Sequence, residues 1–189
     1  MAQSPDTAPD DLPVPADDGA AAHLPGAPVP AIALPSTSGG TFRLDGLDGR
    51  ERLVLYAYPR TGRPGDEPLT PDWDSIPGAR GCTPESCGFR DHAAELRAAG
   101  AAVAGVSTQD TAYQREAVER LGLPFPLLSD ADLQLTRALR LPTFQATGQT
   151  LLKRLTLVLH EGVVEHVFYP VFPPGDHAGE VLRWLRAAS

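Results

Sequence analysis

Residues 81–106 read GCTPESCGFRDHAAELRAAGAAVAGV, a stretch that predicts a helix followed at once by a buried strand. Thr83 is a suitable N-cap and Pro84 suits the first helical position, so we expect the helix at residues 84–99. A glycine ends the helix, and the apolar run at residues 101–106 has the length and composition of a buried strand. The stretch therefore supplies one helix and one strand of an α/β fold.

The segment upstream supplies a second strand. Residues 52–58 read RLVLYAY, which is rich in β-branched and aromatic residues, and Pro59 ends the run. Strand, crossover helix and strand make a βαβ unit, which predicts a parallel core to the sheet. The same reasoning predicts the remaining elements, namely strands at residues 31–34, 41–44, 125–128, 154–160 and 163–168, and helices at residues 111–121, 133–139 and 176–187. A central mixed β-sheet flanked by helices, with a hairpin near its end, resembles the thioredoxin-like fold.

The length of 189 residues fits one domain. Residues 1–23 are acidic, rich in Pro and Ala and without periodicity, so we expect a disordered tail there. The folded domain is then residues 24–189. A long Pro- and Gly-rich loop at about residues 60–80 interrupts it, and loops of this length in compact domains are often functional.

Charge and hydropathy argue against several classes of function. The net charge is −8, and five of the 24 acidic residues but none of the 16 basic ones lie in residues 1–22, which leaves 19 acidic residues against 16 basic ones elsewhere. No basic groove for nucleic acid is indicated. The apolar runs are far shorter than the roughly 20 residues of a membrane helix. No secretory signal is visible, so we expect a cytoplasmic protein without a membrane partner.

Cys82 and Cys87 are the only cysteines. In a cytoplasmic chain, a pair this close indicates redox chemistry or metal binding before a structural disulfide. Cys82 lies just before the predicted helix start, where unpaired N–H groups and the helix dipole should lower the pKa of its thiol, although Glu85 opposes this. Five helical residues place the two Cα atoms roughly 8–9 Å apart, beyond the roughly 7 Å that a disulfide can bridge. If the two cysteines pair, the first turns of the helix must unwind.

Two other interpretations of the pair stay open at this point. Both cysteines could be inert buried residues. A zinc site would use Cys82, Cys87 and His92, but the sequence offers no obvious fourth ligand. The position of Cys82 at a strand–loop–helix junction favours the redox interpretation over both.

A family resemblance extends along most of the chain. The run GCTPESCGFRDHAAEL (81–96) closely resembles the active-site helix of peroxiredoxins of the bacterioferritin-comigratory, or peroxiredoxin Q, type. The likeness continues through GVSTQD (105–110), LPFPLLSDAD (123–132) and KRLTLVLHEGVVEHVFYPVFPPGDHAGEVLRWL (153–185). It covers almost everything from Pro25 onward, and its motifs are specific.

The resemblance implies roles for four residues. Cys82 would attack peroxide as the peroxidatic cysteine and become a sulfenic acid, and Cys87 would be the resolving cysteine that closes an intramolecular disulfide with it. Arg154 would lie beside the thiolate and hold the peroxide, and Pro59 would shield the site. The implied substrates are hydrogen peroxide and organic hydroperoxides, and the implied reductant is thioredoxin or a similar dithiol. The resemblance implies no metal and no organic cofactor, and we expect a monomer or a weak homodimer.

The chain departs from the family pattern beside this site. The family usually has Thr or Ser three residues before the peroxidatic cysteine, where this chain has Ala79. Pro59 precedes Cys82 by 23 residues in place of the usual 7, so an insertion of about 16 residues lies next to the site. The hydroxyl that Ala79 lacks could come from one of four nearby residues, namely Thr61, Thr70, Ser75 and Thr83.

Two rival functions also follow from the sequence. One is a non-peroxidatic, thioredoxin-like disulfide oxidoreductase, which usually has a C-x-x-C spacing. The other is a catalytically silent binding module that has kept the fold. Of the remaining side chains, Trp73 is expected to pack the inserted loop down rather than cap the substrate cleft. His160, His166 and His177 are expected to be solvated.

Overall fold

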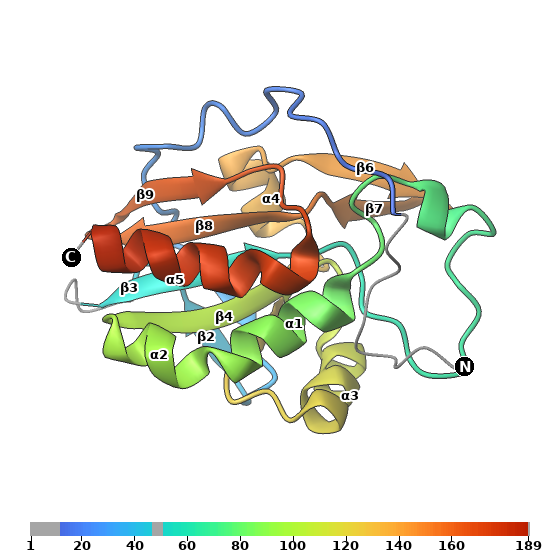
Figure 1. Cartoon of the computed structure of the whole chain (residues 1–189), viewed down its shortest axis with the longest axis horizontal. Coiled ribbons are helices and arrows are strands. Elements are labelled where there is room, and N and C mark those ends of the chain that lie inside the picture. The colour runs from blue at the N-terminus through green and yellow to red at the C-terminus, as the bar shows by residue number, and fades with distance from the viewer. Residues whose placement is uncertain (1–11, 47–50, 189) are drawn as a thin grey trace.

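The computed structural model describes residues 12–46 and 51–188, with a five-stranded sheet at its centre (Figure 1). The order of its strands is β5-β4-β3-β8-β9. Their bounds are Arg52–Ala57 for β3, Ala101–Ser107 for β4, Leu127–Ser129 for β5, Leu155–His160 for β8 and Val163–Phe168 for β9. β3, β4 and β5 pair in parallel, whereas β8 and β9 run antiparallel to their neighbours. The mixed sheet predicted from the sequence is confirmed.

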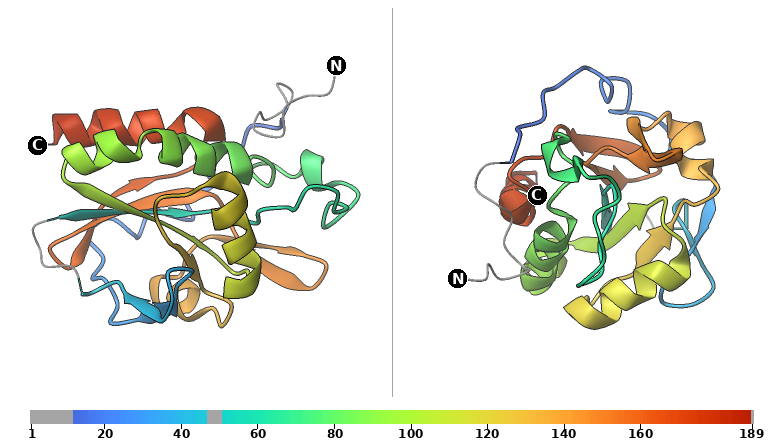
Figure 2. Two further views of the ribbon diagram at one scale, coloured as in Figure 1. Left: turned by 90° about the horizontal axis from the view of Figure 1, so that it is seen from below. Right: turned by 90° about the vertical axis from the view of Figure 1, so that its right-hand side faces the viewer.

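Helices cover both faces of this sheet (Figure 2). One face carries α1 (Cys82–Asp91), α2 (Ala93–Ala98) and α5 (His177–Ala187). The other face carries α4 (Gln134–Leu139) and a small sheet of β1 (Ala33–Pro35) and β2 (Thr41–Arg43). Helix α3 (Thr111–Leu121) lies beside the edge strand β5. Among the residues described, no helix is long and apolar enough to cross a membrane.

The central strand β3 builds a core on each side of the sheet. Tyr56 and Tyr58 are fully buried in the core beneath α1 and α5, whereas Leu53 and Leu55 are buried in the core on the opposite face. This alternation is the period of two that a strand imposes on its side chains. The Tyr56 ring stacks on Phe89 of α1 with centroids 4.6 Å apart, so the sheet fixes the helix that carries both cysteines.

The helix predicted at residues 84–99 is wrong in two respects. It begins two residues earlier, because Gly81 and not Thr83 is the N-cap, with a φ of 110°. A Cβ on Gly81 would lie 2.4 Å from Pro174 Cγ, so both the backbone angle and the close approach require glycine. The helix is also interrupted at His92, which separates α1 from α2. The contact with Pro174 comes from a distant part of the chain and leaves no local signal.

A hairpin that the sequence reasoning missed supports the inserted loop. It consists of β6 (Thr143–Ala146) and β7 (Gln149–Leu152), joined by Thr147 and Gly148 at positive φ. Trp73, in the short 3-10 helix η1 (Trp73–Ser75), is 7% exposed and packs against this hairpin, with its ring 6.2 Å from that of Phe144. The prediction that Trp73 packs the loop down is confirmed, but Trp73 also lines a cavity at Cys82, so it contributes both to loop packing and to the cavity wall. The loop extends from the body of the domain beside β6 and β7 (Figure 1).

The N-terminal segment differs from the predicted disordered tail. Residues 1–11 lie outside the described residues, but residues 12–23 run over the outside of the domain. Asp18 accepts hydrogen bonds from Lys153 Nζ at 2.6 Å and from the Tyr169 hydroxyl at 2.7 Å, and Ala21 is 5% exposed. One of the acidic residues that suggested disorder, Asp18, thus bonds two side chains of the folded domain.

Candidate active site

Cys82 is the first residue of α1 and is 3% exposed. Its Sγ lies 3.2 Å from Arg154 Nη2 and donates a long hydrogen bond of 3.7 Å to the carbonyl oxygen of Ala79. The backbone amide of Arg60, at the other end of the insertion, also bonds the sulfur. Both ends of the inserted loop therefore meet at Cys82.

Arg154 lies between β7 and β8 and is 3% exposed. Besides the contact with Cys82, its Nη2 donates to the carbonyl oxygens of Gly78 and Arg80, each at 3.2 Å, and its Nη1 donates to Glu85. One guanidinium thus joins the thiol, the end of the insertion and the first turn of α1. From residue types alone, Arg154 would be taken for an ordinary arginine at a strand edge, whereas the structure places it in the core beside the sulfur.

Glu85 completes a buried ion pair that the sequence reasoning did not find. Its carboxylate is fully buried and bonds Arg154 through Oε2. Within the described residues, Glu85 Oε1 and Arg154 Nε have no hydrogen-bond partner. The sequence shows only an acidic residue in the first turn of a helix, and this local pattern does not identify the distant Arg154 as its partner.

Burial raises the pKa of the Cys82 thiol. Arg154 lowers the pKa of this thiol, and the negative charge of Glu85 raises it. Burial is the largest cause, so the sequence-based prediction of a lowered pKa is wrong for this buried sulfur. For the Glu85 carboxyl, too, burial raises the pKa and Arg154 opposes the shift. Burial disfavours the charge on Arg154, but Cys82 and Glu85 raise the pKa of its guanidinium, so the group stays protonated.

Cys87 lies in the same helix as Cys82 and is 6% exposed. Neither cysteine forms a disulfide. The sequence predicts Cys82 just before the helix, but both cysteines lie within one continuous helix, α1, which ends at Asp91 and is separate from α2.

His177 is buried, so the prediction that it is solvated is wrong. It is 1% exposed, and its ring nitrogens lie 2.8 Å from Thr156 Oγ1 and 3.0 Å from Glu180 Oε2. These two partners offset the cost of burying its polar atoms. His177 also acts electrostatically on Glu85, so it belongs to the surroundings of the ion pair.

A cavity of about 290 Å³ opens onto Cys82. Its walls come from the insertion, from the start of α1 and from α3. Pro59 is buried at the end of β3 but does not line the cavity, so a shielding role for it stays a prediction.

Among the four candidates for the missing hydroxyl, only Thr83 lines the cavity. Thr61 is buried and donates to Gln109 Oε1, Thr70 Oγ1 is buried without a partner among the described residues, and Ser75 is exposed in η1. The zinc interpretation finds no support, since no three His, Cys, Asp or Glu side chains in the described parts of the chain are grouped to hold a metal.

Replacing Glu85 with glutamine is expected to lower the pKa of Cys82. The substitution removes the carboxylate that raises this pKa and leaves Arg154 to act on the sulfur alone. Thiol alkylation in a Cys87→Ser background should therefore reach half its maximal rate at a lower pH. Glu95→Gln, on exposed α2, is the charge-matched control and should leave the profile in place. An unchanged or raised midpoint in Glu85→Gln would show that Glu85 does not act on the thiol.

Comparison with known proteins gives consistent matches over the folded region. The redoxin family profile matches residues 24–182. Peroxiredoxin Bcp of Escherichia coli K12 is 30% identical over 161 residues, which cover 83% of this chain and 92% of that protein. The chloroplastic peroxiredoxin Q of Oryza sativa subsp. japonica is 32% identical over 163 residues, covering 86% of this chain but 66% of its own length. The chain thus spans about two-thirds of the plant relative.

Solved structures agree with these matches. Peroxidoxin BcpB of Mycobacterium tuberculosis superposes with a TM-score of 0.71 at 29% identity, covering 88% of this chain and 99% of that one. The bacterioferritin comigratory protein of Xanthomonas campestris, described with an alkyl peroxide reduction activity, has a TM-score of 0.67 at 27% identity, covering 86% and 97%. Both likenesses cover nearly the whole of the solved chain.

Proposed function

The chain belongs to the redoxin family, in its peroxiredoxin Q/Bcp branch with a thioredoxin-like fold, and on this premise we propose that it is a thiol peroxidase with Cys82 as its nucleophile. The observation that carries the proposal is the contact of 3.2 Å between Cys82 Sγ and Arg154 Nη2 at a cavity that can admit a peroxide. A cation fixed beside a buried sulfur stabilises its thiolate and can bind the peroxide oxygens.

In the first step, the Cys82 thiolate attacks one peroxide oxygen and the O–O bond breaks. The sulfur gives up two electrons and becomes a sulfenic acid, and the other oxygen leaves as an alkoxide or hydroxide that takes up the proton lost by the thiol. Arg154 supports this step because its charge lies 3.2 Å from the sulfur, where it stabilises the thiolate and the negative charge that develops beside it during attack. The products are one sulfenic acid and one alcohol or water.

In the second step, the Cys87 thiol attacks the Cys82 sulfenic acid, and a disulfide and water form. Both sulfurs lie in α1, so the first turns of this helix must unwind. The break at His92 supports the proposal, because α1 can rearrange while α2 keeps its place on the sheet. Reduction by an external dithiol then restores both thiols and leaves the dithiol oxidised.

The proposal extends to the partner and the compartment. A thioredoxin-like dithiol is the reductant, and hydrogen peroxide and organic hydroperoxides are the substrates, as the alkyl peroxide activity named for the Xanthomonas campestris protein supports. A cytoplasmic location stays a prediction, since the curated relatives include bacterial and chloroplastic proteins. The monomer or weak homodimer also stays a prediction. The rival disulfide oxidoreductase is disfavoured, because it needs two sulfurs that can pair without unwinding a helix.

Peroxide consumption with dithiothreitol as reductant tests this function. We expect turnover by the wild-type chain, and in Cys87→Ser we expect loss of the intramolecular disulfide together with faster inactivation at high peroxide. The reason is that an unresolved sulfenic acid is exposed to further oxidation to sulfinic acid, which mass spectrometry detects on Cys82. A wild-type chain that consumes no peroxide would overturn the proposal. Equal inactivation of wild type and Cys87→Ser would remove the resolving role alone.

A further inference from the structure

The cavity at Cys82 has a composition that favours one class of peroxide, an inference that rests on the proposed function. One wall is apolar and comes from the insertion, where Leu69, Trp73 and Ala79 line the cavity. The methyl group of Ala79 lies in the apolar cluster of Trp73, and a hydroxyl there would be buried among apolar groups. This wall suits a hydrocarbon group better than water or hydrogen peroxide.

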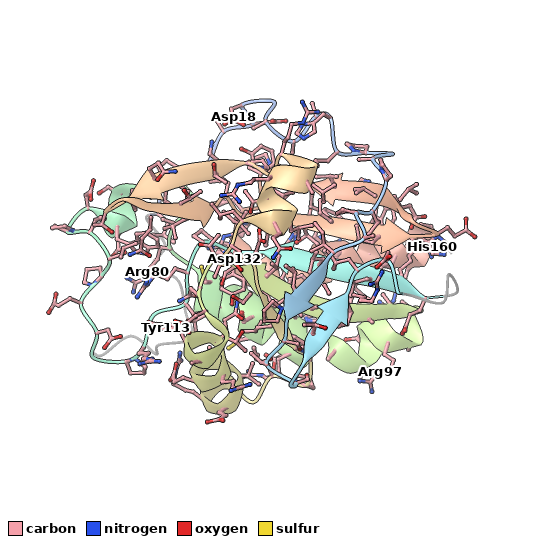
Figure 3. All side chains as sticks on the ribbon, turned by 180° about the vertical axis from the view of Figure 1, so that it is seen from behind. Asp18, Arg80, Arg97, Tyr113, Asp132 and His160 are labelled. Carbon is pink, nitrogen blue, oxygen red and sulfur yellow. The ribbon has the colours of Figure 1, made fainter. Side chains whose placement is uncertain are left out.

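The cavity lining also carries cationic side chains. Four arginines line the cavity, namely Arg60, Arg63, Arg80 and Arg120, against two exposed acidic residues, Asp66 and Glu67. Figure 3 shows Arg80 and Tyr113 at the same end of the molecule, beside the insertion. The lining therefore carries an excess of positive charge although the whole chain is acidic.

The arginines differ in how their charges are compensated. Arg80 pairs with Asp74 at 2.9 Å, and Arg63 and Arg120 share Glu116 at 3.9 and 2.6 Å. Arg60 has no carboxylate partner among the described residues.

The environment of Arg60 holds its charge in place. Its guanidinium carbon lies 5.0 Å from the centroid of the Tyr113 ring, and its Nη2 donates to the Tyr113 hydroxyl at 3.4 Å. Its charge is thus positioned on an aromatic ring without being neutralised.

Arg60 also links this charge to the reacting atom. Its backbone amide bonds Cys82 Sγ, so its guanidinium lies within one hydrogen bond plus one side-chain length of the sulfur. We propose that the cavity binds hydroperoxides that carry a carboxylate, with an apolar group between the carboxylate and the hydroperoxide. Arg60 is then a specificity-determining residue that pairs with the carboxylate, while the apolar wall covers the hydrocarbon.

A matched pair of substrates tests this inference. Cumene hydroperoxide and its para-carboxylate derivative share one skeleton and differ in charge, and the readout is the ratio of their kcat/KM values, anionic over neutral. We expect a ratio above one in the wild type at low salt, a fall of about fivefold or more in Arg60→Gln, and a smaller fall in Arg60→Lys. Raising the salt concentration should compress the wild-type ratio, because ions screen a partly exposed pair.

Arg97→Gln is the control for net charge. Arg97 is exposed on α2, at the opposite end of the molecule from Arg80 and Tyr113 (Figure 3), so its removal should leave the ratio unchanged. A wild-type ratio of one or less, or equal ratios in wild type and Arg60→Gln, would overturn the inference while peroxidase activity stands. Absence of turnover with both substrates and with hydrogen peroxide would instead overturn the proposed function.

Discussion

Replacing Cys82 with serine is expected to stop peroxide consumption, with a loss of at least about a thousandfold in kcat/KM. A serine hydroxyl does not ionise near neutral pH and cannot take up the peroxide oxygen as a sulfenic acid. The two side chains are nearly the same size, and Cys82 is 3% exposed at the start of α1, so the fold should persist. The measurement is the dithiothreitol-coupled consumption of hydrogen peroxide.

Cys87→Ser is the matched control for this substitution. It removes the second sulfur from the same helix, yet the first turnover of the reduced protein with peroxide should remain. Peroxide consumption that persists in Cys82→Ser would contradict the account and move the chemistry to another group.

Replacing Arg154 with glutamine is expected to lower kcat/KM for hydrogen peroxide by about 100- to 1,000-fold, the range found when one charge-stabilising donor is removed from an active site. Arg154 is the only cation that the structure shows bonded to Cys82 among the described residues. Its loss leaves burial to disfavour the thiolate without opposition from a guanidinium. Stopped-flow measurement of the first oxidation step isolates this effect from the later steps.

The substitution also breaks a buried ion pair, and that effect must be separated from catalysis. Leaving Glu85 uncompensated in the core is expected to cost about 3–5 kcal/mol of stability. Arg154→Gln combined with Glu85→Gln removes both charges, so urea unfolding should show much of that stability regained while the oxidation rate stays low. Recovery of the rate in the double variant would show that Arg154 acts only through the fold.

The sheet and the cysteines were predictable because their signals are local. The alternation in RLVLYAY places one set of side chains on each face of β3, and the structure confirms both cores. The spacing of Cys82 and Cys87 within a helix is likewise a local pattern, as is the likeness of the surrounding residues to a known family. The position of Arg154 beside Cys82 came from that likeness and not from the residues around it.

The features that the sequence did not predict depend on contacts between segments that are distant along the chain. The approach of Pro174 to Gly81 fixes where α1 begins, and the pairing of Arg154 with Glu85 joins residues 69 positions apart. The wrong direction predicted for the pKa of Cys82 has the same origin. A helix start alone favours a thiolate, but the burial of the sulfur is a property of the whole fold.

The central claim is that peroxide converts Cys82 and Cys87 into a disulfide within one helix. Both cysteines lie between Arg80 and Arg90, so trypsin releases them together on the peptide 81–90. The reduced protein is treated with one equivalent of hydrogen peroxide, quenched with N-ethylmaleimide and digested. The account predicts a peptide 81–90 that is lighter by two hydrogens and carries no maleimide, with a matching loss of helical circular dichroism before digestion. Two alkylated cysteines on this peptide after peroxide treatment would contradict it.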